Sequence, residues 1–246
     1  MDIYDRSRRL FGESDFQKLR SAHVVLVGYG AVGSLAAEAL VRSGVGHIRI
    51  IDGDSVEPTN INRQIPALHS TVGFRKVDVA RHRLLDISPD CEVNTVDCFL
   101  EASNMEIAFS AFADGIFPLL VVDAIDSLTS KAELLAYCAK HGFPVVSSMG
   151  AARKRDPLAV RVDDISKTQV CPLARHLRKA LRDRGVTQGV RCIYSVENAQ
   201  GGTHEALDSG APLRSKAMGS VMTVTGVFGL TAASEAMKYI MLNGWK

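Results

Sequence analysis

The stretch GYGAVGS at residues 28–34 constrains the fold of this chain more than any other. It follows the apolar run HVVLVG (23–28) and precedes LAAEALVRSG (35–44). A strand, a glycine turn and a helix in this order begin many doubly wound α/β sheets, where the turn holds the phosphates of a nucleotide. We therefore predict a nucleotide-binding α/β protein.

Each glycine of the turn has a physical reason to be glycine. Gly28 permits the tight turn, Gly30 lets the backbone approach a phosphate, and Gly33 lets the helix pack closely on the strand. Asp52 ends the next strand, at the spacing of a carboxylate that binds ribose hydroxyls. The alternative is a turn whose glycines are only structural, and Asp52 makes that alternative the weaker one.

Strand-like and helical patterns alternate through the first 150 residues. Alternation of this kind predicts a Rossmann-like, mostly parallel sheet with helices on both faces. The strand-like runs are 23–28, 47–52, 91–97, 119–124 and 143–148. The helical patterns are 31–43, 73–87, 104–113 and 127–141.

The pattern changes after Gly150. We expect one domain over 1–246, with a nucleotide-binding half at 1–150 and a C-terminal extension at 151–246 for substrate binding and dimer contacts. In the extension we predict strands at 158–165 and 190–197, a helix at 171–185, a mobile loop at 198–216 and an apolar helix at about 218–241.

Composition excludes several classes of protein. The net charge of +2 is too small to imply nucleic-acid binding by itself. Residues 217–234 carry no charge, but their Ser, Thr and Gly residues favour a buried helix over a membrane span. The charged N-terminus is unlike a signal peptide. Five cysteines without a C-x-x-C pair favour a reducing cytoplasm and argue against a disulfide framework or a structural zinc site.

Polar and cationic residues gather after Asp52. Hydride transfer needs no cations near the phosphates, whereas nucleotidyl transfer does, because negative charge builds on phosphate oxygens in the transition state. This cluster therefore favours nucleotidyl transfer over an NAD-dependent oxidoreductase. Its members are Asp54, Asn60, Asn62, Arg63, Gln64, Arg75 and Lys76.

Two acidic residues follow the strand at 119–124. Asp123 and Asp126 stand where the carboxyl end of a parallel strand places ligands. A carboxylate there can hold Mg²⁺ while the metal bridges phosphates. The alternatives are a turn residue for Asp123 and a helix N-cap for Asp126. With Arg63 and Lys76 nearby in the sequence, magnesium binding by Asp126 is the favoured interpretation.

These motifs together resemble the HesA/MoeB/ThiF superfamily, which has the fold of ubiquitin-activating enzymes. The shared order is G-x-G-x-x-G, D-x-D-x-V-x-x-x-N-x-x-R-Q, a following Lys, and D-x-x-D-S. The resemblance implies ATP on the glycine turn and adenylation of a carboxylate. It further implies that Asp52 binds the ribose, Lys76 the phosphates and Asp126 the Mg²⁺, with Asn60, Arg63 and Gln64 at the triphosphate end. It also implies a homodimer, in which Arg63 could act on the partner's site.

The region after residue 150 resembles the tRNA threonylcarbamoyladenosine dehydratase branch of that superfamily. The residues that carry this resemblance are GAARKRDPLAVRVDDISKTQVCPLARHLRKALRDRGV, VRCIYSVE and GSVMTVTGVFGLTAASEAMK. It implies a tRNA whose threonyl carboxylate is adenylated and then attacked within the same side chain, closing a ring with loss of water. It leaves open whether a sulfur-transfer protein takes part.

Basic residues in 153–182 fit a nucleic-acid partner. Leu173, Leu177 and Leu181 make an apolar stripe, and cations occupy another face of the same helix. Such a face can track a phosphate backbone, and the alternative is an ordinary solvated helix face. The candidate tRNA-binding residues are Arg153, Lys154, Arg155, Arg175, Arg178, Lys179 and Arg182.

Other functions stay open from the sequence. One is adenylation of the C-terminal glycine of a small ubiquitin-like sulfur carrier, and another is a nucleotide-dependent binding protein without catalysis. Cys171 or Cys192 could form a thioester, but free cysteines are mostly packing residues and the proposed chemistry needs none.

Overall fold

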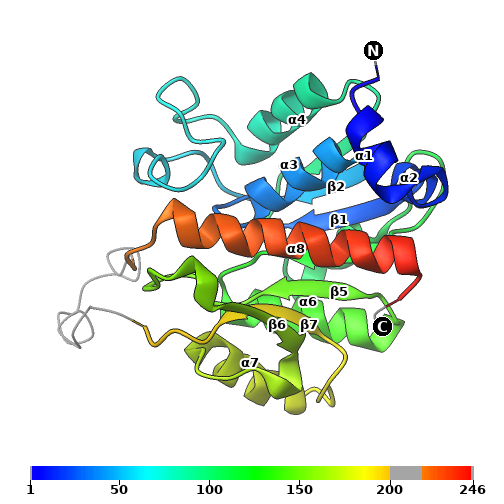
Figure 1. The fold of residues 1–246 in the computed structure, drawn as a ribbon. Helices are drawn as coiled ribbons and strands as arrows, with labels where there is room; N and C mark the ends of the chain where they lie inside the picture. Colours follow the sequence, from blue (N-terminus) through cyan, green and yellow to red (C-terminus); the bar gives the residue numbers. More distant parts are fainter. Residues whose placement is uncertain (1, 200–217, 245–246) are drawn as a thin grey trace.

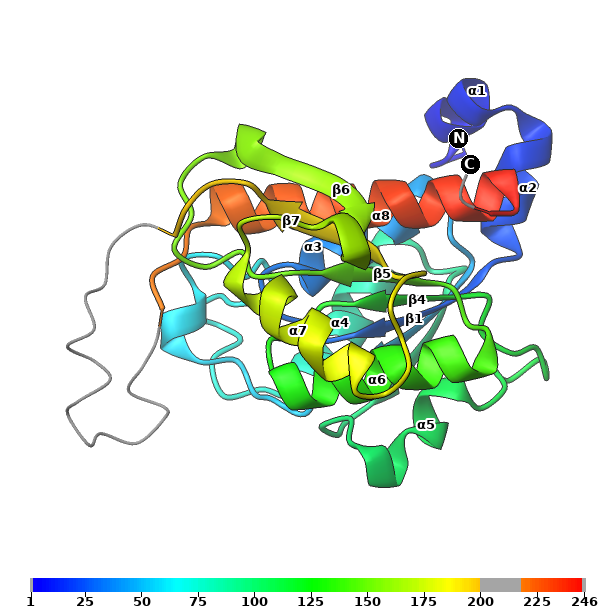
Figure 2. The same ribbon diagram turned by 90° about the horizontal axis from the view of Figure 1, so that it is seen from below.

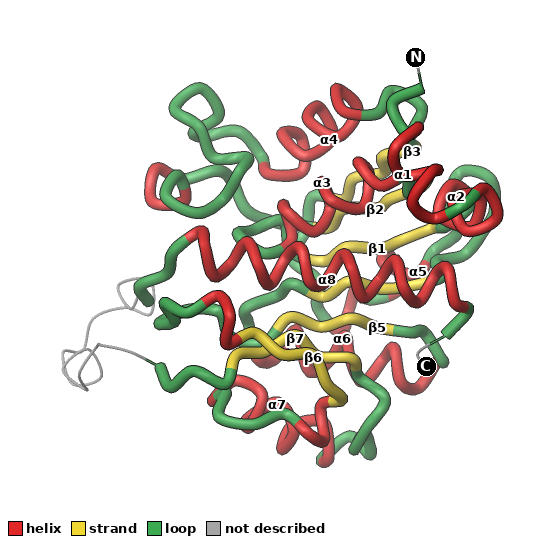
Figure 3. Tube along the Cα trace, in the orientation of Figure 1, coloured by secondary structure: helices red, strands yellow, loops and turns green. Residues whose placement is uncertain are grey.

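The computed structural model describes residues 2–199 and 218–244, and its centre is one seven-stranded sheet in the order β3-β2-β1-β4-β5-β7-β6 (Figures 1 and 3). Every neighbouring pair is parallel except β6 and β7, which are antiparallel. The predicted, mostly parallel sheet is confirmed. Its strands are β1 His23–Val27, β2 His47–Ile51, β3 Glu92–Val96, β4 Leu120–Asp123, β5 Val145–Ser148, β6 Val160–Asp164 and β7 Arg191–Ser195.

Helices cover both faces of this sheet. Figure 2 shows α3 and the long α8 on one face and α6 and α7 on the other. The α-helices are α1 Asp5–Phe11, α2 Glu13–Arg20, α3 Gly33–Ser43, α4 Lys76–Ile87, α5 Glu106–Phe109, α6 Leu128–His141, α7 Pro172–Arg182 and α8 Met222–Leu242. Short 3-10 turns are η1 Pro58–Asn60, η2 Ala102–Asn104, η3 Pro157–Ala159 and η4 Ile165–Lys167.

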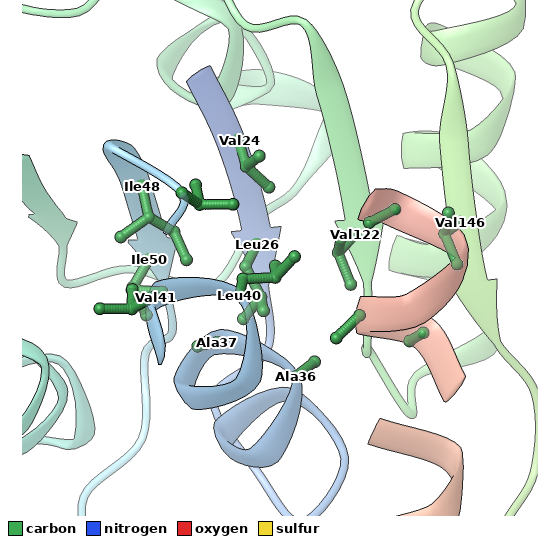
Figure 4. Close-up of a cluster of buried hydrophobic side chains, with 14 of the residues drawn as sticks. Val24, Leu26, Ala36, Ala37, Leu40, Val41, Ile48, Ile50, Val122 and Val146 are labelled. Carbon is green, nitrogen blue, oxygen red and sulfur yellow. The ribbon is translucent and has the colours of Figure 1, made fainter. Parts of the chain in front are cut away.

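The core explains the apolar strands. Val24 and Leu26 of β1 pack toward α3 and α8, together with Ile48 and Ile50 of β2 (Figure 4). Val25 and Val27, which alternate with them in β1, lie in the second core cluster, which includes residues of α6 and α7. A strand buried on both faces is apolar at every position, which is why these runs were recognisable.

The charge-free stretch near the C-terminus belongs to a buried helix, as predicted. Phe228, Ala232 and Ala236 of α8 are fully buried, and a Cβ on Gly229 would lie 2.5 Å from the carbonyl oxygen of Val32. The small residues therefore allow α8 to lie close to the start of α3. Among the described residues, no helix is both long and apolar enough to cross a membrane.

Several sequence predictions differ from the structure, among them the start of the last helix, which is Met222 rather than about residue 218. The helix expected at 104–113 is only α5, because the Arg49 guanidinium takes the carbonyl oxygens of residues 107, 108, 110 and 111 that a longer helix would use. The helix expected from residue 73 begins at Lys76. Helices α1 and α2 were not predicted. The predicted loop at 198–216 lies outside the described residues except for its first two positions.

Substitution of Gly33 tests the close packing at the glycine turn. An ideal Cβ on Gly33 would lie 1.8 Å from the Gly28 carbonyl oxygen, whereas one on Gly30 would meet nothing nearer than 3.9 Å. Overpacking costs about 1–3 kcal/mol, and each kcal/mol lowers Tm by roughly 2–4 °C in a chain of this size. We expect Gly33→Ala to lower Tm by several degrees in a thermal melt, and Gly30→Ala, the matched control, to leave it unchanged. Equal melting of the two variants would contradict this packing.

Candidate nucleotide site

Asp52 ties the end of β2 to the glycine turn. Its Oδ2 accepts the N–H of Tyr29 at 2.6 Å, and its Oδ1 accepts the N–H of Asp54 at 2.8 Å. Burial raises the pKa of the Asp52 carboxyl, while the Lys76 ammonium and these two N–H groups oppose that rise. The acid predicted for the ribose is thus fixed beside the turn predicted for the phosphates.

Lys76 brings a buried positive charge to the same place. It is the first residue of α4, its side chain is 6% exposed, and its Nζ lies 2.9 Å from Oδ2 of Asp54. Asp54 is exposed, so a ligand can compete for this ammonium group. Arg75 is engaged elsewhere, because its guanidinium donates to Asp97, Ser55 and the Gly53 carbonyl.

The turn that contains Arg63 packs on the glycine turn of its own chain. Gln64 is buried, and its Nε2 is the nearest atom to the place where a Cβ of Gly30 would be. Asn60 is also buried and holds the turn, since its Oδ1 accepts the N–H of Glu57. The half-buried Arg63 donates to the Thr59 carbonyl at 2.9 Å. Asn62 donates to the Ser220 carbonyl, which joins this turn to the start of α8.

Three buried polar atoms at the glycine turn have no hydrogen-bond partner among the described residues. They are Oγ of Ser34, in the first turn of α3, Oε1 of Gln64, and the hydroxyl of Tyr29 in the glycine turn itself. A buried polar group without a partner costs about 1–3 kcal/mol. The first N–H groups of a helix and its positive dipole end also favour an anion. The Ser34 hydroxyl and these N–H groups can donate to an anion such as a nucleotide phosphate, and Oε1 of Gln64 can accept from a donor group of a polar ligand.

Asp123 and Asp126 have different environments. Asp123 is fully buried, and its Oδ2 lies 2.6 Å from both Lys131 Nζ and Ser147 Oγ. Its Oδ1 accepts the N–H of Ile125, so Asp123 shapes the turn after β4. Asp126 is exposed, and no described residue bonds its carboxylate. The N-cap of α6 is Ser127, which removes the N-cap interpretation of Asp126.

Sequence reasoning missed Lys131, which holds Asp123 in place. A signal was present: Lys131 lies three, four and seven residues before the buried Leu134, Leu135 and Cys138. A lysine on the apolar stripe of a helix needs a partner, because a buried ammonium without one is costly. Asp123 supplies that partner.

The Lys131–Asp123 pair gives a stability prediction. Removing one member of a buried ion pair costs about 3–5 kcal/mol, because the other charge stays buried, whereas replacing both is much milder. We expect Lys131→Met to lower the free energy of unfolding by that amount in urea denaturation. The double variant Lys131→Met/Asp123→Asn should recover most of the loss. A double variant as unstable as the single one would contradict the pairing.

The predicted tRNA-binding residues are not equivalent. Arg175, Lys179 and Arg182 are exposed on one side of α7, and Arg155 is exposed in the preceding loop. Arg178 is half-buried, and its guanidinium donates to the carbonyl and hydroxyl oxygens of Thr168.

The two remaining candidates are less accessible. Arg153 is half-buried with a left-handed backbone, φ +61°. The prediction that Lys154 is a surface cation was wrong. Lys154 is buried, and its ammonium donates to the carbonyl oxygen of Glu197. The sequence showed a run of cationic residues in a loop, but it could not show which of their side chains is buried.

The cysteines are unpaired thiols. Cys171 and Cys192 are both buried, and burial raises the pKa of the Cys192 thiol well above its usual value. A thiol held neutral is a poor nucleophile. This environment agrees with the expectation that the chemistry uses no cysteine.

A hollow of about 660 Å³ lies elsewhere on the protein. It is lined by residues of α6, including Glu133 and Tyr137, and by the turn after α7, including Arg184 and Gln188. None of the predicted nucleotide-site residues lines it. The candidate site is therefore defined by its polar groups rather than by this hollow.

Known proteins resemble this chain in sequence and in fold. The ThiF family profile matches residues 4–245 of this chain. The chain belongs to the ThiF family.

Two relatives of this chain have the same name, which describes one enzymatic activity. The chain is 42% identical over 195 residues to the tRNA threonylcarbamoyladenosine dehydratase of Bacillus subtilis, covering 79% of this chain and 75% of the relative. It is 40% identical to the protein of that name from Escherichia coli, covering 95% of this chain and 91% of the relative.

Solved structures of an E. coli relative carry nucleotides. The dehydratase TcdA of E. coli in complex with ATP superposes with a TM-score of 0.85 at 38% identity, covering 98% of this chain and 94% of that one. Its complex with AMP gives a TM-score of 0.86 with the same identity and coverage.

Proposed function

We propose that this chain is an ATP-dependent enzyme that dehydrates threonylcarbamoyladenosine in tRNA to its cyclic form. The observation that carries the proposal is the near end-to-end similarity to the E. coli TcdA structures with ATP and AMP. The convergence of the glycine turn, Asp52, the Arg63 turn and Lys76 at one edge of the sheet supports it independently.

The chemistry has two steps. An oxygen of the threonyl carboxylate attacks the α-phosphorus of ATP, the bond to the β-phosphate oxygen breaks, and pyrophosphate leaves. A neighbouring atom of the same side chain then attacks the acyl carbon of the mixed anhydride, and AMP leaves as the ring closes. The nucleoside has lost one water. Attack within one molecule has a high effective concentration, so the enzyme needs no nucleophile of its own.

The residues of the site have distinct roles in this scheme. Gly30 lets the backbone approach the phosphates, Gly28 and Gly33 allow the tight turn and the close start of α3, and Asp52 and Asp54 lie at the ribose side. Asn60, Arg63, Gln64 and Lys76 stabilise negative charge on the triphosphate. We infer that Arg63 acts on the nucleotide of its own chain; the nearness of its neighbour Gln64 to Gly30 of the same chain supports this over action on a partner's site.

Asp126 is the residue that would hold Mg²⁺. A single exposed carboxylate without a protein partner suits this ion, which keeps several waters and is held by one or two carboxylates together with substrate phosphates. The metal, when bound, supplies positive charge to those phosphates. The buried Asp123 cannot take this role while it pairs with Lys131.

Arg63→Ala tests the assignment of transition-state charge. Loss of one such donor typically lowers kcat by about 10²–10³-fold, and the half-exposed Arg63 makes only local hydrogen bonds. We expect that loss in a release assay for pyrophosphate and AMP with threonylcarbamoyladenosine-bearing tRNA, at an unchanged Tm. Arg81→Ala, an exposed arginine of α4, is the control and should keep full activity. Full activity of Arg63→Ala would contradict the proposed site.

The exposed cations of α7 are the proposed tRNA contact. Helix α7 begins beside Gly150, which follows β5, so this face starts near the edge of the sheet that holds Asp52 and Asp126. A phosphate backbone along the helix would then deliver the modified base to the nucleotide. Arg178 supports this face rather than contacting tRNA, because Thr168 holds its guanidinium.

Charge reversal on α7 tests this interface. We expect Arg175→Glu/Lys179→Glu/Arg182→Glu to weaken tRNA binding and to flatten its salt dependence, with the slope of log K against log salt falling by roughly 0.7–0.9 for each phosphate that the protein no longer neutralises. Filter binding over a salt titration measures this, with Arg81→Glu as the control. An unchanged slope would place the tRNA elsewhere.

Other parts of the proposal follow the family resemblance. We propose a homodimer, a reducing cytoplasmic setting that suits the free thiols, and room for a sulfur-transfer partner. Adenylation of a Gly-Gly carrier protein is less well supported, since the chain has no C-x-x-C zinc pairs.

A further inference from the structure

Two histidines and two carboxylates gather at the edge of the sheet opposite the nucleotide site. His23, His47 and Glu92 are the first residues of β1, β2 and β3, and they are direct neighbours across the parallel strands. Asp114, in the loop before β4, faces them. Four residues of strand, about 13 Å, separate His23 from the end of β1 at Val27.

The donor atoms of this cluster are already close together. Nε2 of His23 lies 2.7 Å from Oδ2 of Asp114, and Nδ1 of His47 lies 3.1 Å from Oε2 of Glu92 and 4.0 Å from the same Asp114 oxygen. One ligand atom each from His23, His47 and Asp114 lie within 4.8 Å of one another. Of the described part of the chain, this is the one group of three with that property.

The surroundings orient the ligand atoms. The Ser21 carbonyl lies 3.0 Å from Nδ1 of His23 and can only accept, so that nitrogen carries a hydrogen and Nε2 is the atom that faces Asp114. A metal-binding histidine characteristically has its other nitrogen on such a carbonyl. The carboxylates are also held, because Oδ1 of Asp114 accepts the N–H of Ile116 and Oε1 of Glu92 accepts that of Ala113.

Accessibility differs between the two rings. The side chain of His23 is 3% exposed and packs against the edge of Phe112, whereas His47 is 25% exposed. The rings stack face to face, with centroids 3.9 Å apart and an interplanar angle of 15°. An ion that binds both would therefore turn the more exposed His47 and leave His23 in place.

We propose that His23, His47, Asp114 and Glu92 form a binding site for one divalent transition-metal ion, separate from the Mg²⁺ of the nucleotide site. Two imidazoles and two carboxylates form a donor set that suits Zn²⁺. The ion replaces the proton shared by His23 and Asp114, which passes to solvent. It joins the starts of three strands to the 110–119 loop.

Zinc binding to tag-free full-length protein tests this site. We expect isothermal titration calorimetry to give one Zn²⁺ per chain and a thermal melt to show a higher Tm with Zn²⁺, both in the presence of saturating Mg²⁺. In His47→Ala and in the near-isosteric Asp114→Asn, the Zn²⁺ affinity should fall by at least about 10–100-fold, the cost of losing even a residue that only orients a ligand.

His69→Ala is the matched control, because His69 is exposed in a loop outside the cluster. It should bind Zn²⁺ as the wild type does. No binding to the wild type, or equal affinity in all three variants, would overturn the proposal. Asp114 lies in a loop outside the strands, and asparagine keeps its size and an oxygen that can accept the N–H of Ile116, so Asp114→Asn remains a valid test if His47→Ala does not fold.

Discussion

The contact on which the site depends is the close approach of three backbone segments at the end of β1. A Cβ on Gly28 would lie 2.8 Å from the Ala124 carbonyl oxygen, and one on Gly33 would lie 1.8 Å from the Gly28 carbonyl oxygen. Only glycines allow α3 to begin directly over the turn while the turn lies against the end of β4. This contact brings the N-terminal end of α3 beside the turn that ends in Asp126.

Further hydrogen bonds and a buried ion pair hold these backbone segments in place. Asp52 bonds the N–H groups on both sides of the site, and the buried Lys131–Asp123 pair holds the turn before Asp126. Gln64 closes over Gly30 from the Arg63 turn. The buried Lys76, the half-buried Arg63 and the exposed Asp126 therefore stand on rigid supports, which is the condition for stabilising charge in a transition state.

The sequence predicted the sheet well because strands buried on both faces are largely apolar, as in residues 24–27 of β1 and 120–122 of β4. It predicted which residues gather at the nucleotide site because a recognised motif fixes their spacing along the chain. The role of each residue stays a prediction. The sequence failed to predict local structure that depends on a residue far away in the chain. Arg49 shortens α5, Lys154 turns inward to Glu197, and the proposed metal-binding cluster depends on the register of three strands. Such contacts between residues far apart in sequence leave no local pattern.

The measurement that tests the central claim most directly is nucleoside mass spectrometry of threonylcarbamoyladenosine-bearing tRNA after incubation with the protein, ATP and Mg²⁺. Gentle digestion preserves a cyclic product that water could reopen. The account predicts loss of one water from that nucleoside, only when ATP is present, with AMP and pyrophosphate formed alongside. An unchanged nucleoside, with pyrophosphate released only after a Gly-Gly-ended carrier protein is added, would contradict it.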